Sequence, residues 1–115
     1  MRHIISALVV NQPGVMVRVA GLFSRRGYNI ESIAVGSSED PALSRIIIVV
    51  DAEDDQVVEQ IEKQLYKLID VVKVNDLPPE ESVERELALI KVNAGSQSRS
   101  EVLRIVNIFR AKIID

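Results

Sequence analysis

The spacing of apolar and polar residues differs between successive segments of residues 1–75, and the spacing in each segment predicts one secondary-structure element. The run from His3 to Val10 is almost continuously apolar, as is typical of a central strand. From Val15 to Arg26 the apolar residues recur at the spacing of one helical face, and Gly27 follows two arginines as a helix stop signal. The chain is therefore expected to begin with a strand and a helix.

The following residues predict a hairpin, a second helix and a fourth strand. Tyr28 to Ser37 has the mixed pattern of a partly exposed edge strand, and the β-branched run from Ser44 to Val50 comes after a polar, turn-rich segment. The acidic residues 51–55 supply a helix cap, and the last strand is expected over Asp70 to Asn75. Apolar residues line one face of the helix between them: Val57, Val58, Ile61, Leu65, Leu68 and Ile69.

The order strand, helix, strand, strand, helix, strand predicts an α+β domain of the ferredoxin-like βαββαβ type. In this fold, two helices cover one face of a four-stranded antiparallel sheet. Right-handed crossovers place strands one and three in the centre of the sheet and strands two and four at its edges. We therefore expect residues 28–37 and 70–75 to form the two edges.

The pattern divides the chain into a domain over residues 1–77, a linker over 78–82 and a second unit over 83–115. The linker has paired prolines and acidic residues without apolar periodicity. Because the second unit repeats only the first strand-helix-strand order, we interpret it as an incomplete βαβ unit. Either the chain is truncated there, or this unit completes its sheet on a partner chain.

Three elements are expected in the second unit. Glu86 to Val92 is an apolar strand, and a strand begins again at Ala111 and runs to Ile114. Between them lies a helix from Ser98 to Arg110, in which Ser98 and Glu101 have the spacing of a capping box.

Composition excludes several classes of function. The net charge of −3 argues against a nucleic-acid partner. No apolar run approaches the roughly 20 residues that span a bilayer, and the N-terminus lacks a signal-peptide pattern, so we expect a cytoplasmic protein with no membrane partner. Cysteine is absent, and the single histidine, His3, is interpreted as structural. We predict no metal site, no cofactor site and no catalytic residues.

The turn Asn11-Gln12-Pro13-Gly14, between the first strand and the first helix, is the main candidate site. The unpaired amides at a helix start carry a partial positive charge and suit an anionic group such as a carboxylate. A plain strand-to-helix connection is the commoner explanation of such a turn. A third hypothesis is an acylphosphatase-like hydrolase, in which Gly14 to Arg18 form a phosphate loop and Asn29 positions a water molecule.

An ordered series of segments along essentially the whole chain resembles the small regulatory subunits of acetolactate synthase (acetohydroxyacid synthase). The segments are residues 11–14, 21–33, 40–45, 60–68 and 83–87. The resemblance implies an N-terminal ACT domain, a βαββαβ fold that binds amino acids, and the beginning of a C-terminal domain. It also implies a regulatory subunit rather than an enzyme, because thiamine diphosphate, magnesium and flavin belong to the separate catalytic subunit.

The same resemblance implies the partners and the site. The subunit would bind the large catalytic subunit, raise its activity and confer feedback inhibition by a branched-chain amino acid, usually valine. Its ACT domains would pair as a homodimer through edge strands, with the effector bound between them. The residues implied on the turn side are Asn11, Gly14, Val15 and Met16. Asn29 and Ile30 are implied as the contribution from across the interface.

Overall fold

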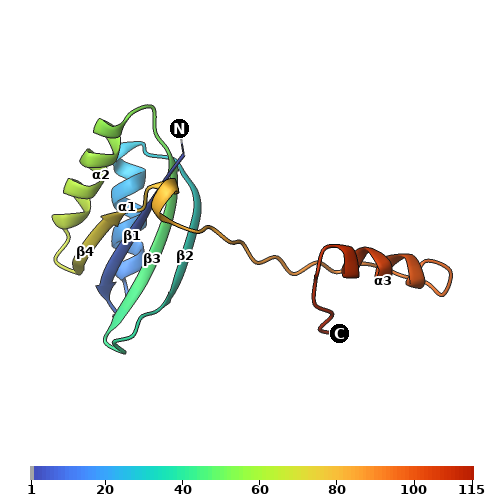
Figure 1. Cartoon of the computed structure of the whole chain (residues 1–115). Helices are drawn as coiled ribbons and strands as arrows, with labels where there is room; N and C mark the ends of the chain where they lie inside the picture. The colour runs from blue at the N-terminus through green and yellow to red at the C-terminus, as the bar shows by residue number, and fades with distance from the viewer. Residues whose placement is uncertain (1) are drawn as a thin grey trace. The chain divides into compact units, whose positions relative to one another are not determined.

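The computed structural model describes residues 2–115, which form two compact units over residues 2–83 and 84–115. The first unit holds a four-stranded sheet with two helices (Figure 1). Its elements are β1 (Arg2–Val10), α1 (Val15–Arg26), β2 (Ile30–Ser37), β3 (Leu43–Asp51), α2 (Asp55–Tyr66), β4 (Val71–Asp76) and the short 3₁₀ helix η1 (Pro79–Glu81).

The sheet has the predicted topology. Its strand order is β2-β3-β1-β4, and every neighbouring pair is antiparallel, so β1 and β3 are central and β2 and β4 are edges. Ile48 of β3 lies opposite Ile5 of β1 on one side and Ile33 of β2 on the other. Such cross-strand partners share one face of the sheet. The ferredoxin-like βαββαβ fold is therefore confirmed.

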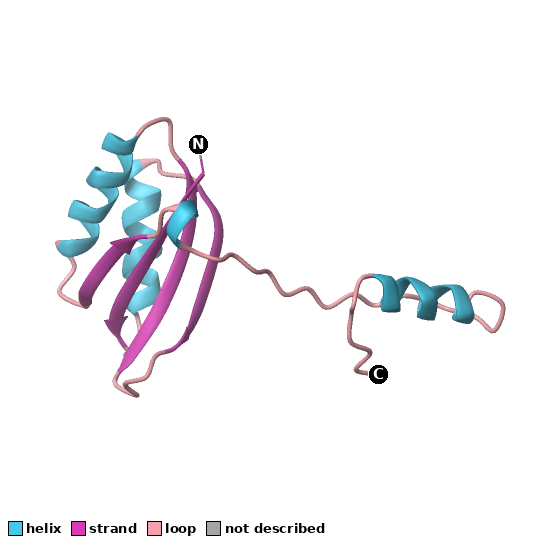
Figure 2. Ribbon diagram, viewed as in Figure 1, coloured by secondary structure: helices cyan, strands magenta, loops and turns pink. Residues whose placement is uncertain are grey.

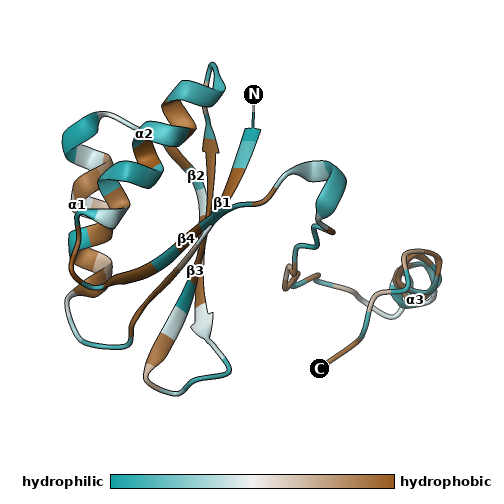
Figure 3. Ribbon diagram, turned by 60° about the vertical axis from the view of Figure 1, so that its left-hand side comes forward, coloured by the Kyte–Doolittle hydropathy of each residue, from teal (hydrophilic) through white to brown (hydrophobic). Residues whose placement is uncertain are grey.

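Both helices cover the same face of the sheet, and the core lies between the two layers (Figures 2 and 3). Phe23 of α1 is 1% exposed, and its ring meets Tyr28 edge to face with 6.1 Å between the ring centroids. Alternate residues of the strands point into this layer because successive side chains of a strand face opposite sides. The largest fully buried side chains are Phe23, Ile5, Ile46, Ile48, Ile61, Leu65, Val9, Val19 and Val50.

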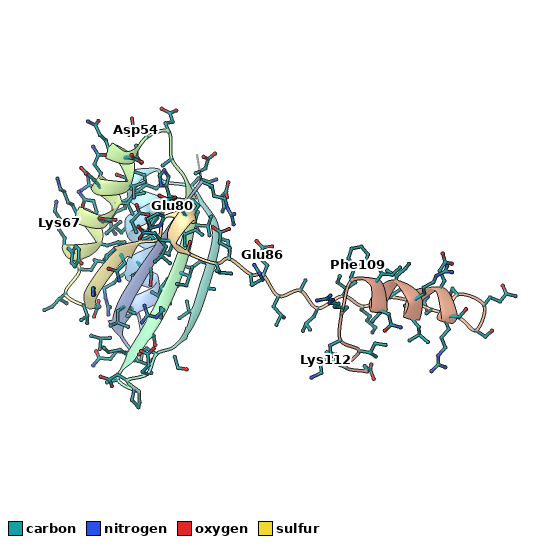
Figure 4. All side chains as sticks on the ribbon, in the orientation of Figure 1. Asp54, Lys67, Glu80, Glu86, Phe109 and Lys112 are labelled. Atoms are coloured by element: carbon teal, nitrogen blue, oxygen red, sulfur yellow. The ribbon has the colours of Figure 1, made fainter. Side chains whose placement is uncertain are left out.

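Helix α2 begins as predicted and ends earlier than the apolar pattern indicates. Asp54, labelled in Figure 4, caps it by accepting a hydrogen bond from the Val57 amide at 3.1 Å. The prediction that Ile69 lies on the buried helical face is wrong, because Ile69 is 96% exposed. The helix ends at Tyr66, so Ile69 lies in the turn before β4, where helical periodicity no longer sets the direction of its side chain.

The two edges of the sheet differ in their hydrogen bonds. On β4, the Tyr66 hydroxyl donates to the Val74 carbonyl at 3.2 Å and accepts from the Val74 amide at 2.9 Å. These are backbone groups that an added strand would need, so Tyr66 blocks this edge. On β2, every residue after Ile30 is exposed, including Val35 at 51%. The β2 edge is the one left accessible for pairing.

Replacing Tyr66→Phe should lower the free energy of unfolding by about 1 kcal/mol, because the Val74 amide and carbonyl lose their partner. Urea denaturation measures this difference. Tyr28→Phe is the matched control, since the Tyr28 hydroxyl has no hydrogen-bond partner within residues 2–115. Equal stability of the two variants would contradict the role given to the Tyr66 hydroxyl.

The second unit contains one regular element, α3 (Arg99–Ile108). The strands expected over 86–92 and 111–114 are not formed, because a strand needs a neighbour for its backbone groups and neither segment joins the sheet of the described residues. The capping box is also wrong, since the Ser98 hydroxyl bonds to the amide and carbonyl of Gly95 instead. Phe109, at the end of α3, is 78% exposed (Figure 4).

Candidate functional site

The Asn11–Gly14 turn joins the end of β1 to the start of α1. Gly14 is the residue before the helix and has a φ of 87° and a ψ of −11°, in the left-handed region that side chains disfavour. Its carbonyl accepts from the Arg18 amide at 3.1 Å, which forms the first turn of the helix. Glycine therefore allows β1 to lead directly into α1 and leaves the first amides of the helix without helical partners.

On one side, the turn is attached to the loop between β2 and β3. The Asn11 amide donates to the Ala42 carbonyl at 2.8 Å, and the Asn11 side-chain nitrogen donates to the Pro41 carbonyl at 3.4 Å. The side-chain oxygen of Asn11 accepts no hydrogen bond from residues 2–115. That oxygen is available as an acceptor for a cationic group.

On the other side, Arg18 and Asp70 form an ion pair with 2.6 Å between Nε and Oδ2. The Asp70 side chain is 10% exposed and the Arg18 side chain is 48% exposed. The hydrogen bond to Asp70 raises the pKa of Arg18 further above its ordinary value. The guanidinium is positively charged at neutral pH with or without this contact. Because Arg18 binds Asp70, the structure does not support the hypothesis that Gly14 to Arg18 form an acylphosphatase-like phosphate loop.

A pocket of about 80 Å³ lies beside the turn, between the first residues of α1, the end of β1, the start of β3 and Val35 of β2. Three of the predicted site residues line it, namely Asn11, Val15 and Met16. Gly14 is not in the lining, although it starts the helix whose first residues are. The full lining is Val9, Val10, Asn11, Gln12, Val15, Met16, Val35, Ser44 and Ile46.

Val35 and Ser44 belong to the pocket and were missing from the sequence-based site. They come from β2 and β3, and the register pairs Val35 with Ile46 and Ser44 with Val9. Two features of the sequence could have indicated these positions: the polar turn between the two strands, and the alternation of apolar and polar residues within each strand. The register of β2 and β3 decides which of their residues lie beside the end of β1, and the apolar and polar pattern does not predict this register.

The other two predicted residues, Asn29 and Ile30, lie away from the pocket of their own chain. Ile30 is at the start of β2 and pairs with Val50, whereas Val35 near the end of β2 pairs with Ile46. The two positions on β2 are about 15 Å apart along an extended strand. The structure thus brings Asn11, Val15 and Met16 together in one pocket and places Asn29 and Ile30 at the other end of the edge strand.

The pocket is smaller than a complete site for a small molecule, which usually measures about 300 Å³ or more. Within residues 2–115, no three His, Asp or Glu side chains gather as potential metal ligands. No helix of the same residues is long and apolar enough to cross a membrane. The chemistry available is a helix start, the side-chain amides of Asn11 and Gln12, the Ser44 hydroxyl and an apolar wall, which suits a small molecule with an anionic group and an apolar side chain.

Comparisons with known proteins agree on one family. A family model described as an AHAS small subunit-like ACT domain matches residues 5–73, and one described as the small subunit of acetolactate synthase matches residues 85–115. The probable acetolactate synthase small subunit of Methanothermobacter thermautotrophicus is 59% identical over 114 residues, covering 98% of this chain and 67% of that protein. The acetolactate synthase small subunit of Mycobacterium avium is 58% identical over 113 residues, covering 98% of this chain and 67% of that protein.

Solved structures give the same result. The crystal structure of the acetolactate synthase small subunit from Thermotoga maritima is similar with a TM-score of 0.94 and 56% identity, covering all of this chain and 71% of that one. The ACT domain of GTP pyrophosphokinase from Chlorobium tepidum reaches a TM-score of 0.62 at 15% identity, covering 75% of this chain and 92% of that one. This second likeness is one of fold alone.

Proposed function

This chain belongs to the family of acetolactate synthase small subunits, and from that premise we propose that it binds valine at a site shared by two copies of its ACT domain. Binding there controls the separate catalytic subunit, which carries the thiamine diphosphate, magnesium and flavin. The observation that supports the proposal is the pocket at the Asn11–Gly14 turn. This pocket is smaller than a complete ligand site and lies next to the accessible edge of β2.

The edge strands favour dimerisation through β2. Tyr66 occupies the outward backbone groups of Val74 on β4, whereas the exposed residues of β2 offer an unpaired edge. Ile33 and Val35 lie on the helix-bearing face, opposite Ile48 and Ile46, and are still 40% and 51% exposed. A second copy paired along β2 would extend the sheet and cover these two side chains.

A two-fold axis also explains why the predicted residues lie at two ends of β2. When β2 pairs antiparallel with its copy, the start of one strand lies beside the end of the other. Asn29 and Ile30 of the second copy then approach the end that contains Val35, and Val35 lines the pocket of the first copy. Each dimer thus has two identical sites, each built from one turn and one opposing strand.

The chemistry of such a site matches an amino acid. The Met16 and Val17 amides in the first turn of α1 bind the carboxylate, because they carry the positive end of the helix dipole. The side-chain oxygens of Asn11 and of the opposing Asn29 bind the ammonium group. Val15 and Met16 contact the apolar side chain. Binding of valine is coupled to the catalytic subunit by about 1 to 3 kcal/mol, the usual range for allosteric coupling.

Titration calorimetry with valine, leucine and isoleucine tests this proposal, first on the chain alone and then with the catalytic subunit. We expect saturable binding of one amino acid per chain, with valine preferred, and feedback inhibition of the reconstituted enzyme. Absence of binding of all three amino acids would contradict the proposal.

We propose in addition that residues 83–115 are the beginning of a second ferredoxin-like domain, after an ACT domain of residues 1–77 and a linker of 78–82. The match of the second family model to residues 85–115 supports this division. Apolar side chains in this unit are largely exposed, among them Leu87 at 88% and Ile90 at 81%, so they are expected to be covered in the assembled protein.

Asn29→His should weaken valine binding more than about tenfold, because the larger imidazole lacks an amide oxygen for the ammonium group of the opposing site. Asn29 is exposed in the single chain, so the fold should tolerate the change. Asn75→His, at an exposed position of β4 on the other edge, is the matched control. Full feedback inhibition of the holoenzyme with Asn29→His would count against the assignment.

A further inference from the structure

Asp70 holds both ends of the Asn11–Gly14 turn, although it is far from the turn in sequence. Its backbone carbonyl accepts from the Val10 amide at 2.9 Å, just before the turn. Its carboxylate accepts from Arg18 Nε at 2.6 Å, in the first turn of α1 just after it. One buried residue therefore fixes the distance between the strand that enters the turn and the helix that leaves it.

The guanidinium of Arg18 also lies against the turn itself. A Cβ atom built on Gly14 would lie 3.1 Å from Arg18 Nη1. Neither Arg18 nor Asp70 lines the pocket that contains Asn11, Val15 and Met16. The pair therefore makes no direct contact with a molecule in this pocket, and it can affect binding by holding the turn in place.

We propose that Arg18 and Asp70 are positioning residues that hold the Asn11–Gly14 turn in its ligand-binding conformation. The inference rests on the proposed function of this turn as one half of the valine site. Glycine has more accessible backbone conformations than any other residue, so a turn containing Gly14 without external support would have to be ordered at the moment of binding. An ion pair that orders the turn beforehand removes this entropy cost from the binding step.

Asp70→Asn tests the proposal because it keeps the shape of the side chain and removes its charge. We expect the dissociation constant for valine, measured by calorimetry on the full chain, to rise about three- to tenfold. Arg18→Gln should raise the dissociation constant for valine by a similar factor. The double variant should have a dissociation constant no higher than the higher of the two single variants, because both changes break the same contact. The population of dimers, measured by light scattering, should not change.

The control is Arg26→Gln, on the same helix, which removes an exposed hydrogen bond to Gln64 at 3.0 Å and does not touch the turn. Its valine affinity should equal that of the unchanged chain. If Asp70→Asn does not fold, Arg18→Gln gives the same test at a half-exposed side chain.

The outcomes separate this inference from the function on which it rests. If the unchanged chain does not bind valine, the proposed function fails. If the unchanged chain binds valine and the variants lose only thermal stability while their affinity stays the same, the pair is merely structural and the inference is overturned.

Discussion

Gly14→Asp should abolish measurable valine binding while leaving the domain folded. The φ of 87° at Gly14 strains any side chain by about 1 to 2 kcal/mol, although aspartate tolerates this region better than most residues. The new carboxylate would lie next to Arg18 Nη1, since a Cβ at this position is 3.1 Å from that atom. It would compete with Asp70 for Arg18 and would place a negative charge at the helix start that is meant to receive the carboxylate of the effector.

Gly27→Asp is the matched control for this prediction. Gly27 ends α1 and has a similar left-handed φ of 73°, and a Cβ there meets nothing within 4 Å. The substitution therefore brings the same change of charge and a similar backbone strain at the opposite end of the helix. Calorimetry should find valine affinity nearly unchanged in Gly27→Asp and lost in Gly14→Asp. Equal losses in the two variants would contradict the specific role given to the Gly14 turn, because Gly27 lies at the other end of the helix.

Ile33→Asp should convert the protein to monomers and thereby remove valine binding. Ile33 is 40% exposed at the accessible edge of the sheet, so a single chain tolerates a polar side chain there. Pairing through β2 would place two such carboxylates close together and away from water, which costs several kcal/mol. Light scattering at micromolar concentration should give the mass of one chain.

Val72→Asp is the control on the opposite edge of the sheet, where Val72 of β4 is 52% exposed. It introduces the same charge on an edge strand and should leave both the dimer and the valine affinity unchanged. If Val72→Asp dissociates the dimer and Ile33→Asp does not, the chain pairs through β4 and the assignment of the site is wrong.

The fold of the first unit was predictable because local periodicity and local stop signals determine it. The bounds of α1 agree with the pattern, since the turn with Gly14 and the cap at Gly27 define its ends within the chain. The strand order followed from the number and sequence of elements. The exposed position of Ile69 was not predictable, because a helix that ends one turn early leaves the apolar spacing intact in the sequence.

The candidate site was predictable only where its residues lie close together in the sequence. The turn and the first helical residues are contiguous, so Asn11, Val15 and Met16 could be selected before the pocket was known. Asp70 contacts Arg18 from another part of the chain, and an acidic residue between a helix and a strand has no pattern that indicates such a contact. In the second unit, the apolar segments resemble strands, although no neighbouring strand in the described residues pairs with them.

The measurement that tests the shared site most directly is valine calorimetry on an equimolar, re-equilibrated mixture of Gly14→Asp and Asn29→His chains. Neither variant should bind valine well alone. Random exchange makes about half of the dimers mixed, and each mixed dimer contains one site with an unchanged turn and an unchanged opposing strand. About one quarter of all sites should therefore recover the original affinity. If the mixture binds no more valine than the separate variants, the site is not shared between two copies.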